Sequence, residues 1–189
     1  LKQAKKMVRV CERNNISLVI NPSNLGIEPR DWPRASLTTG LALCLALDEL
    51  LESPALTLKW PNDVLLDHRK ISGILLEGTA GRLVIGIGIN VNCSFQEAPD
   101  SLRSTATSLL DATGRKFSLD DVLIRILQQL DQQLRRLACH DTTLLTDWQQ
   151  RCQLTGRNLE VTTENRQFRG VCQGIDQHGA LVLVDGVQC

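Results

Sequence analysis

The sequence lacks a net charge, a long apolar run and any cysteine pair spaced for a metal. Its 189 residues carry 21 Lys and Arg against 21 Asp and Glu. Non-specific binding to nucleic acid needs clustered excess Lys and Arg to neutralise phosphates, so this balance argues against it. The longest apolar stretch, residues 41–51, is shorter than the about 18 residues of a membrane span and contains Asp48 and Glu49. We therefore expect a buried helix there and no membrane partner, and no apolar signal segment precedes Leu18.

The seven cysteines are odd in number, widely spaced and without a Cys-x-x-Cys pair. A disulfide framework uses an even set and a structural zinc site uses closely spaced pairs, so the pattern favours neither. Free thiols are typical of a reducing compartment and predict a cytoplasmic protein. His68, His140 and His178 are far apart in sequence, and we expect them in solvated turns rather than in a metal site.

What the chain does contain is an ordinary globular composition, with 42% hydrophobic and 22% charged residues. A chain of this length buries roughly 70% of its unfolded surface, enough for one core and a small appendage. A cluster of basic residues predicts a helix with one solvated face within 2–13. Apolar spacing and turn residues predict further helices at 35–51, 118–137 and 142–152, and strands at 17–21, 56–58, 64–66, 71–77, 83–91, 159–163, 166–175 and 180–184. These elements predict helices mixed with strands, followed by a small all-β module after about residue 153.

The most informative segment is KWPNDVLLDHRKISG, residues 59–73, which surrounds a predicted β-hairpin with a polar turn at 67–70. A lysine at a strand edge can bind a phosphate or a carboxylate as a point charge, and Asn62 can bind an amide or an adenine edge. Asp63 can hold a cation such as Mg²⁺ or a donor on a substrate. Each residue type is also common at exposed hairpin positions, so spacing alone leaves both interpretations open.

The strand predicted at 83–91 is unusual because it contains Gly86 and Gly88. Glycine weakens the interior of a strand, so two of them suggest the close approach of a backbone or a ligand. Cys93 follows this strand, and we expect it to serve in packing.

Three segments together resemble the biotin protein ligase family. KWPND at 59–63, followed by RKISGILLE at 69–77, is similar to the family's signature. GIGINVN at 86–92 is similar to its second signature strand, and GIDQHGAL at 174–181 is similar to its SH3-like C-terminal module. The resemblance covers residues 16–186, nearly the whole chain.

The resemblance implies a fold and a reaction. The fold is α+β, with a mixed sheet and packed helices of the class II synthetase type in a catalytic domain at 1–153 and a small SH3-like β module at 154–189. The reaction is a two-step acyl transfer in which biotin and ATP, with Mg²⁺, form biotinyl-5′-AMP and pyrophosphate. A lysine of a biotin carboxyl carrier domain then attacks the mixed anhydride.

The resemblance also assigns roles by position. Lys70 is the expected catalytic residue beside the biotin carboxylate and the α-phosphate, where an ammonium stabilises the negative charge of the attack. Gly73 borders the biotin pocket, where a Cβ would crowd the ligand. Trp60 is expected to pack. The residues expected to bind ATP or the adenylate are Lys59, Asn62, Asp63 and Asn90, of which Asp63 is also the candidate Mg²⁺ ligand.

The sequence departs from the family at both ends. Family members carry a Gly/Arg-rich loop of the GRGRxGR kind before the strand that corresponds to 17–21, but the first glycine of this chain is Gly26. The chain also stops at Cys189, before the closing strands of the module. We therefore expect an N-terminally incomplete catalytic domain, a truncated module and little or no ligase activity, because an open site lets water reach the acyl-adenylate. No helix-turn-helix segment precedes the catalytic domain, so repressor activity has no support.

Two alternatives to a biotin ligase stay open. A lipoate or octanoate transferase shares the general fold and also handles a carboxylic acid and a carrier lysine, but the segments 59–73 and 86–92 favour biotin. A non-catalytic remnant that keeps a carrier-binding surface is favoured by the missing loop and disfavoured by Lys70 and Asn90. The expected partner is a biotin carboxyl carrier domain, and a homodimer is left open.

Overall fold

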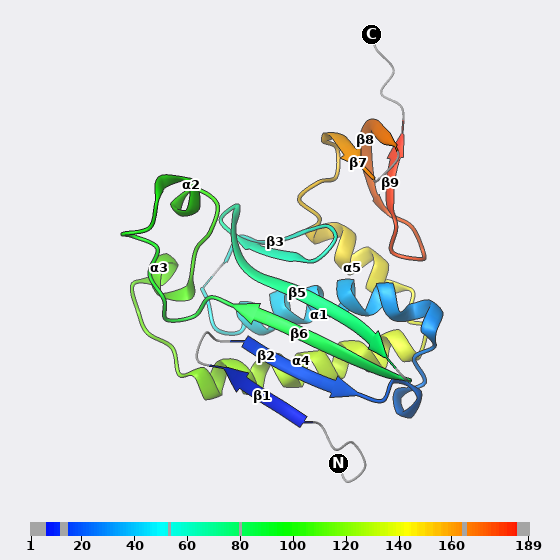
Figure 1. Cartoon of the computed structure of the whole chain (residues 1–189), viewed down its shortest axis with the longest axis horizontal. Helices are drawn as coiled ribbons and strands as arrows, with labels where there is room; N and C mark the ends of the chain where they lie inside the picture. Colours follow the sequence, from blue (N-terminus) through cyan, green and yellow to red (C-terminus); the bar gives the residue numbers. More distant parts are fainter. Residues whose placement is uncertain (1–6, 12–14, 53, 80, 164–165, 185–189) are drawn as a thin grey trace.

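The computed structural model describes residues 7–11, 15–52, 54–79, 81–163 and 166–184 (Figure 1). The helices and strands are, in chain order, β1 Met7–Cys11, β2 Asn15–Ile20, η1 Pro22–Leu25, η2 Pro29–Asp31, α1 Trp32–Asp48, β3 Leu56–Lys59, β4 Asp63–Leu66, β5 Arg69–Thr79, β6 Arg82–Ile89, α2 Asp100–Arg103, α3 Leu109–Thr113, α4 Leu119–Ala138, α5 Thr143–Arg151, β7 Asn158–Thr162, β8 Gln167–Ile175 and β9 Leu181–Val184.

Six strands form one large sheet in the order β1-β2-β6-β5-β4-β3. All five strand pairs are antiparallel. Four of these pairs join strands that follow one another along the chain, and short connections between neighbouring strands require antiparallel pairing. The predicted α+β class is confirmed, with packed helices and a separate small C-terminal sheet. Where a mixed sheet was expected, parallel pairing is confined in the described residues to two isolated bridges, Leu58 with Cys152 and Lys70 with Ala106.

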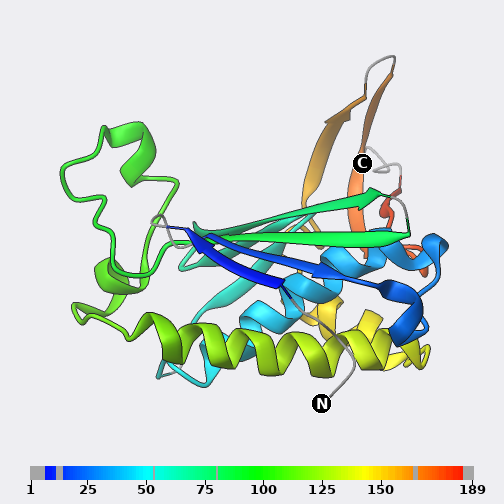
Figure 2. The same cartoon turned by 60° about the horizontal axis from the view of Figure 1, so that its bottom comes forward.

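Helices α1 and α4 lie together on one face of the large sheet and leave the other face open (Figure 2). Helix α1 is buried on nearly every side, because the sheet, α4 and α5 all contact it. Helix α4 begins after Ser118, whose Oγ accepts a hydrogen bond from the backbone N–H of Asp121 at 3.3 Å. Its buried side chains recur at helical spacing and form one apolar stripe: Val122, Ile126, Leu130, Leu134 and Leu137.

The C-terminal sheet, with strand order β7-β8-β9, is attached to the rest of the molecule through side-chain contacts. Nε1 of Trp60 donates a hydrogen bond to the carbonyl of Gly179, in the turn between β8 and β9, at 3.1 Å. Nε2 of Gln149 in α5 donates to the carbonyl of Ile175 at 3.1 Å. Trp60 therefore joins the segment 59–63 to the C-terminal sheet, a role beyond the packing expected from the sequence.

The structure corrects two local predictions. The helix expected within 2–13 is wrong where residues are described, because Met7–Cys11 form strand β1; residues 1–6 and 12–14 lie outside the described residues. The alternating Val8 and Val10 favour a strand, and β1 pairs antiparallel with β2. The turn expected at 67–70 is tighter, since only Asp67 and His68 form it, with φ of 50° and 64°. Lys70 is therefore a strand residue.

The structure also bears on the cysteines, the histidines and the apolar helix. The described cysteines, Cys44, Cys93, Cys139, Cys152 and Cys172, are free thiols. The three histidines are exposed, and His68 and His140 occupy left-handed turn positions, as expected. Among the described residues, none of the helices combines the length and the hydropathy needed to cross a bilayer.

Candidate active site

The open face of the large sheet has a floor of glycine backbone. Alternation along β5 and β6 turns Ile74 and Ile87 toward the helices, where both are at most 3% exposed. Gly73, Gly86 and Gly88 therefore lie on the opposite face, and we call these three residues the glycine floor. Gly73 and Gly88 are direct neighbours across β5 and β6. Because the floor has no side chains, a ligand can lie flat against the sheet there.

Two polar side chains border the glycine floor. A Cβ added at Gly73 would lie 3.1 Å from Nζ of Lys70, and a Cβ added at Gly88 would lie 3.1 Å from Oδ1 of Asn15. Asn15 also pairs with Gly88 across β2 and β6. The floor thus has an ammonium donor on one side and an amide oxygen on the other, and both are close enough to contact a molecule lying between them.

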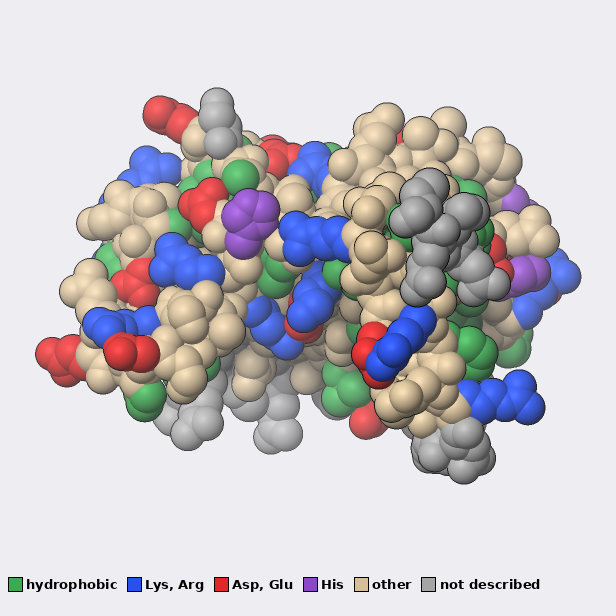
Figure 3. Space-filling model, turned by 90° about the horizontal axis from the view of Figure 1, so that it is seen from above, with side chains coloured by type: hydrophobic (Ala, Val, Ile, Leu, Met, Phe, Trp, Pro, Cys, Tyr) green, Lys and Arg blue, Asp and Glu red, His purple; other side chains and the backbone are tan. Residues whose placement is uncertain are grey.

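Lys70 forms an ion pair with Asp63, with 2.5 Å between Nζ and Oδ1. The lysine side chain is 47% exposed, while Oδ1 of Asp63 is buried and makes no hydrogen bond among the described residues beyond this ion pair. Because the lysine side chain is half-exposed, a substrate anion can reach its ammonium while Asp63 holds the ammonium in place. Lys59 pairs with Asp63 across β3 and β4 and adds a second exposed ammonium. Lys and Arg side chains gather near the middle of this side of the molecule, beside the C-terminal sheet (Figure 3).

The backbone of Lys70 is held by a segment distant in sequence. Its N–H donates to the carbonyl of Thr105 at 2.8 Å, and its carbonyl accepts from the N–H of Thr107 at 2.9 Å. These bonds form the parallel bridge to Ala106, which fixes the start of β5 against the chain that follows α2. The lysine backbone is thereby fixed while its side chain stays half-exposed, a suitable arrangement for binding a substrate anion.

The two predicted adenylate-binding asparagines both use their amide nitrogens to hold the backbone. Nδ2 of Asn62 donates to the carbonyl of Ile74 at 2.8 Å, and the N–H of Ile74 donates to the Asn62 carbonyl at 2.9 Å. Nδ2 of Asn90 donates to the carbonyl of Thr107 at 3.0 Å. Asn62 and Asn90 therefore position β5 and the 105–107 segment, and their side-chain oxygens are the atoms left to contact a ligand.

The register of the large sheet gathers most of the predicted site. Lys59 lies opposite Asp63 and Asp63 opposite Gly73, with Lys70 beside them. Among the described residues, His, Cys, Asp and Glu form no group of three that could hold a metal ion. Asp63 is thus a single carboxylate, which is compatible with Mg²⁺ held mainly by the phosphates of a nucleotide and not with a protein-built metal centre.

Cys93 follows β6 and is not an activated nucleophile. Desolvation raises the pKa of its thiol above the usual value, and the nearby Asp111 carboxylate adds to this effect. A raised thiol pKa lowers the fraction of thiolate, the reactive form. The side chain is nevertheless exposed, which does not fit the packing role expected from the sequence.

Sequence reasoning missed Asn15 and the 105–107 segment. Asn15 and Ser17 alternate with the buried Ile16 and Leu18, so the period of two along β2 could have placed both polar residues on the open face. The 105–107 segment has no such signal, because its role consists of backbone hydrogen bonds to Lys70.

Comparisons with known proteins agree with this geometry. Residues 13–94 match the model of the Biotin/lipoate A/B protein ligase family. Over 174 residues, the chain is 33% identical to the bifunctional ligase/repressor BirA of Bacillus subtilis, covering 89% of this chain and 52% of that protein. It is also 30% identical to the biotin--[acetyl-CoA-carboxylase] ligase of Mycobacterium tuberculosis, covering 90% of this chain and 64% of that protein. These matches support membership of the biotin protein ligase family.

A solved family structure extends the agreement to the fold. The biotin protein ligase of Aquifex aeolicus superposes with a TM-score of 0.80 at 27% identity, covering 90% of this chain and 74% of that one. The same ligase solved in complex with biotin and ATP gives a TM-score of 0.78 at 28% identity. The chain spans about half the length of the BirA relatives. The family therefore fixes the fold, and what this chain does is argued from its own residues.

Proposed function

We propose that this chain activates biotin with ATP and transfers it to a lysine of a biotin carboxyl carrier domain. The observation that carries the proposal is the half-exposed Lys70 ammonium beside the glycine floor, on the open face of the sheet. Biotin has a compact bicyclic ring system with a planar ureido group and a carboxylate on a flexible chain. The floor offers space for the rings, and Lys70 offers a cation for the carboxylate.

In the proposed first step, a carboxylate oxygen of biotin attacks the α-phosphorus of ATP, and the bond to pyrophosphate breaks. Negative charge concentrates between the two anionic reactants, and the Lys70 ammonium stabilises it. In the second step, a neutral amine of the carrier lysine attacks the acyl carbon, AMP leaves, and the proton of the amine passes to solvent. The bonds from Thr105 and Thr107 keep the Lys70 backbone in one position throughout.

The nucleotide is proposed to lie toward Lys59, Asn62, Asp63 and Asn90. Lys59 contributes positive charge to the phosphates, and the side-chain oxygens of Asn62 and Asn90 are available as acceptors. Mg²⁺ would arrive with the nucleotide phosphates, neutralising their charge, and Asp63 is the carboxylate placed to contact it.

The division of labour follows the two sheets. We propose that residues 1–153 form the catalytic domain and residues 154–189 the C-terminal module. The carrier domain is proposed to bind at the open face of the large sheet.

Free thiols, both buried and exposed, fit a reducing cytoplasm, where we place the protein.

The proposal is tested by incubating the purified chain with Mg-ATP and, separately, biotin, lipoate or octanoate, and detecting acyl-AMP by mass spectrometry. A carrier domain is then added, and its mass is followed. We expect biotinyl-AMP and a biotinylated carrier, with lipoate and octanoate at background. Acyl-AMP from lipoate instead would identify the transferase alternative. Carrier binding without any adenylate would identify the remnant.

A further inference from the structure

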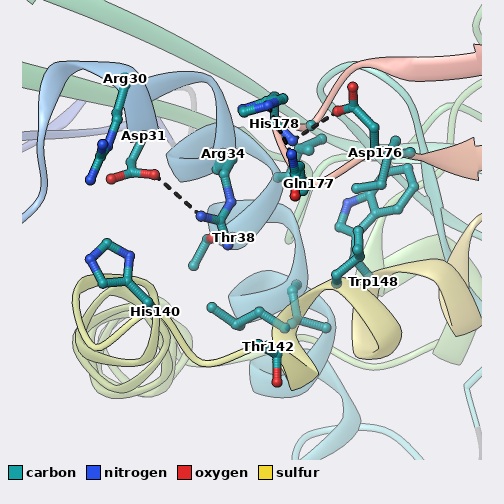
Figure 4. A pocket seen from close by; sticks show the side chains of 16 residues that line it. Arg30, Asp31, Arg34, Thr38, His140, Thr142, Trp148, Asp176, Gln177 and His178 are labelled. Atoms are coloured by element: carbon teal, nitrogen blue, oxygen red, sulfur yellow. Dashed lines mark hydrogen bonds and ion pairs between the residues drawn. The ribbon is translucent and has the colours of Figure 1, made fainter.

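A cavity of about 540 Å³ lies away from the glycine floor, on the helical side of the molecule (Figure 4). It is enclosed by the start of α1, the connection between α4 and α5, α5 itself, and the turn between β8 and β9. The labelled side chains come from these four elements. Neither Lys70 nor any residue of the glycine floor lines it, so it is separate from the proposed active site.

The inner wall of this cavity is apolar. Leu144 and Trp148 of α5 line it, each at most 6% exposed, together with Leu37 and Leu41 of α1. A wall that combines an indole ring with leucine side chains can bury a flat or branched apolar group, which is the main source of affinity in small-molecule sites. The size and composition fit a small organic molecule better than an ion.

The rim of the cavity carries two carboxylates, each held by the protein through its Oδ1. Asp31 is buried and its Oδ1 contacts Nη1 of Arg34 at 3.2 Å. Asp176 folds back on its own turn, where Oδ1 accepts from the N–H groups of His178 and Ala180 at 2.8 and 2.9 Å. Both rim carboxylates are therefore engaged within the protein.

Arg34 is the principal donor left on the rim. Its guanidinium has five N–H groups, the described contacts use only Nη1, and its side chain is 23% exposed. Arg30 lies beside it but pairs with Glu28 in solvent, which makes it a weaker second cation. A partly desolvated guanidinium with free donors is suited to a planar carboxylate.

We propose that this cavity is a second binding site, for a small amphipathic carboxylate whose apolar body lies on Trp148 and Leu144 and whose head contacts Arg34. The site also reaches the segment 59–63. Gly179 lines the cavity, and its carbonyl accepts the hydrogen bond from Trp60, two residues before Asn62. A ligand that shifts the β8–β9 turn therefore changes the contact of Trp60, so the site is placed to modulate the active site.

The three tryptophans provide the test, because each indole N–H gives one resonance in a ¹⁵N-correlated spectrum. Trp148 lines the cavity, Trp60 contacts its wall, and Trp32 packs elsewhere, against Gly78. The probe is 4-phenylbutanoate, with 4-phenylbutanamide as the uncharged match. We expect saturable movement of the Trp148 signal at millimolar probe, smaller movement of Trp60, a stationary Trp32, and at least about tenfold weaker binding of the amide.

Variants and biotin complete the experiment. Arg34→Gln should weaken the probe about tenfold or more, whereas Arg103→Gln, in the exposed helix α2 at the opposite end of the large sheet, should not. Saturating biotin should not compete with the probe, because the glycine floor is a different surface, so the Trp148 signal should still move and saturate in its presence. An immobile Trp148 signal, equal binding of acid and amide, or displacement of the probe by biotin would each overturn the proposal. The amide comparison uses the unmodified chain, so it holds even if Arg34→Gln fails to fold.

Discussion

The two faces of the large sheet differ although the same strands build them. On the helix-covered face, Val64, Ile85 and Ile87 are at most 1% exposed and belong to the main core. On the open face, Leu75 is 61% exposed, and the glycine floor has no side chains. Because successive side chains of a strand point to opposite faces, alternate residues of β5 and β6 build the core on one face and leave room for substrate on the other. The glycines weaken β5 and β6, but the buried side chains on the covered face keep these strands in place.

The largest effect should come from replacing Lys70 on the open face. Lys70→Met removes the ammonium but keeps an unbranched side chain, so biotinyl-AMP formation should fall about 10³-fold, equivalent to about 4 kcal/mol of transition-state stabilisation. The free energy of unfolding should fall by only about 1–2 kcal/mol, because the buried Oδ1 of Asp63 loses its ion-pair partner. Single-turnover adenylation and urea unfolding measure the two quantities, with Lys116→Met as the exposed control. Retained adenylation would remove Lys70 from the mechanism.

A substitution on the covered face should have the opposite signature. Ile87→Ala deletes buried methyl and methylene groups and should lower the free energy of unfolding by about 2–4 kcal/mol. The folded fraction should form biotinyl-AMP at the unmodified rate. Val84→Ala, at a partly exposed position on β6, is the matched control and should cost less than about 1 kcal/mol. If Ile87→Ala slowed adenylation while leaving stability intact, the division between the faces would be wrong.

Filling the glycine floor should reduce binding more than stability. Gly73→Ala adds a methyl group 3.1 Å from the end of the Lys70 side chain, which can move aside. The methyl group then occupies ligand space, so biotin affinity should fall about 10- to 100-fold, equivalent to about 1.4–2.7 kcal/mol. Calorimetric titration measures it, and Glu77→Ala, exposed farther along β5, should leave affinity unchanged. Equal biotin affinity in both variants would mean that biotin does not lie on this floor.

The smallest effect concerns the turn between α4 and α5, which belongs to neither face. Hydrogen bonds from Thr143 and Arg136 lower the pKa of Asp141 to about 2 from 3.8. Because the folded pKa is lowered, this contribution to stability is present above about pH 3.8 and is lost as the pH falls through about 2. Asp141→Asn should flatten the pH dependence of urea unfolding in that window without affecting biotin binding at neutral pH. An unchanged pH profile would contradict the assignment.

Much of this architecture could be predicted from the sequence. Helices α4 and α5 and strands β4 to β9 follow from apolar periodicity and turn residues, and the resemblance placed Lys70 and Gly73 in one site. The prediction of a helix over β1 was wrong, because it was based on the cluster of basic residues and not on the alternation of Val8 and Val10. Contacts made by backbone groups, or between residues far apart in the chain, could not be predicted from the sequence. The bond from Trp60 to Gly179 joins residues 119 positions apart, and nothing local to either residue indicates it.

The central claim, that biotin binds on the open face, is tested most directly by following glycine amide signals in a ¹⁵N-correlated spectrum during titration with biotin. The account predicts that the signals of Gly73, Gly86 and Gly88 move together and saturate, while those of Gly174 and Gly179 at the C-terminal sheet stay in place. Movement of Gly174 and Gly179 with a stationary glycine floor would contradict it.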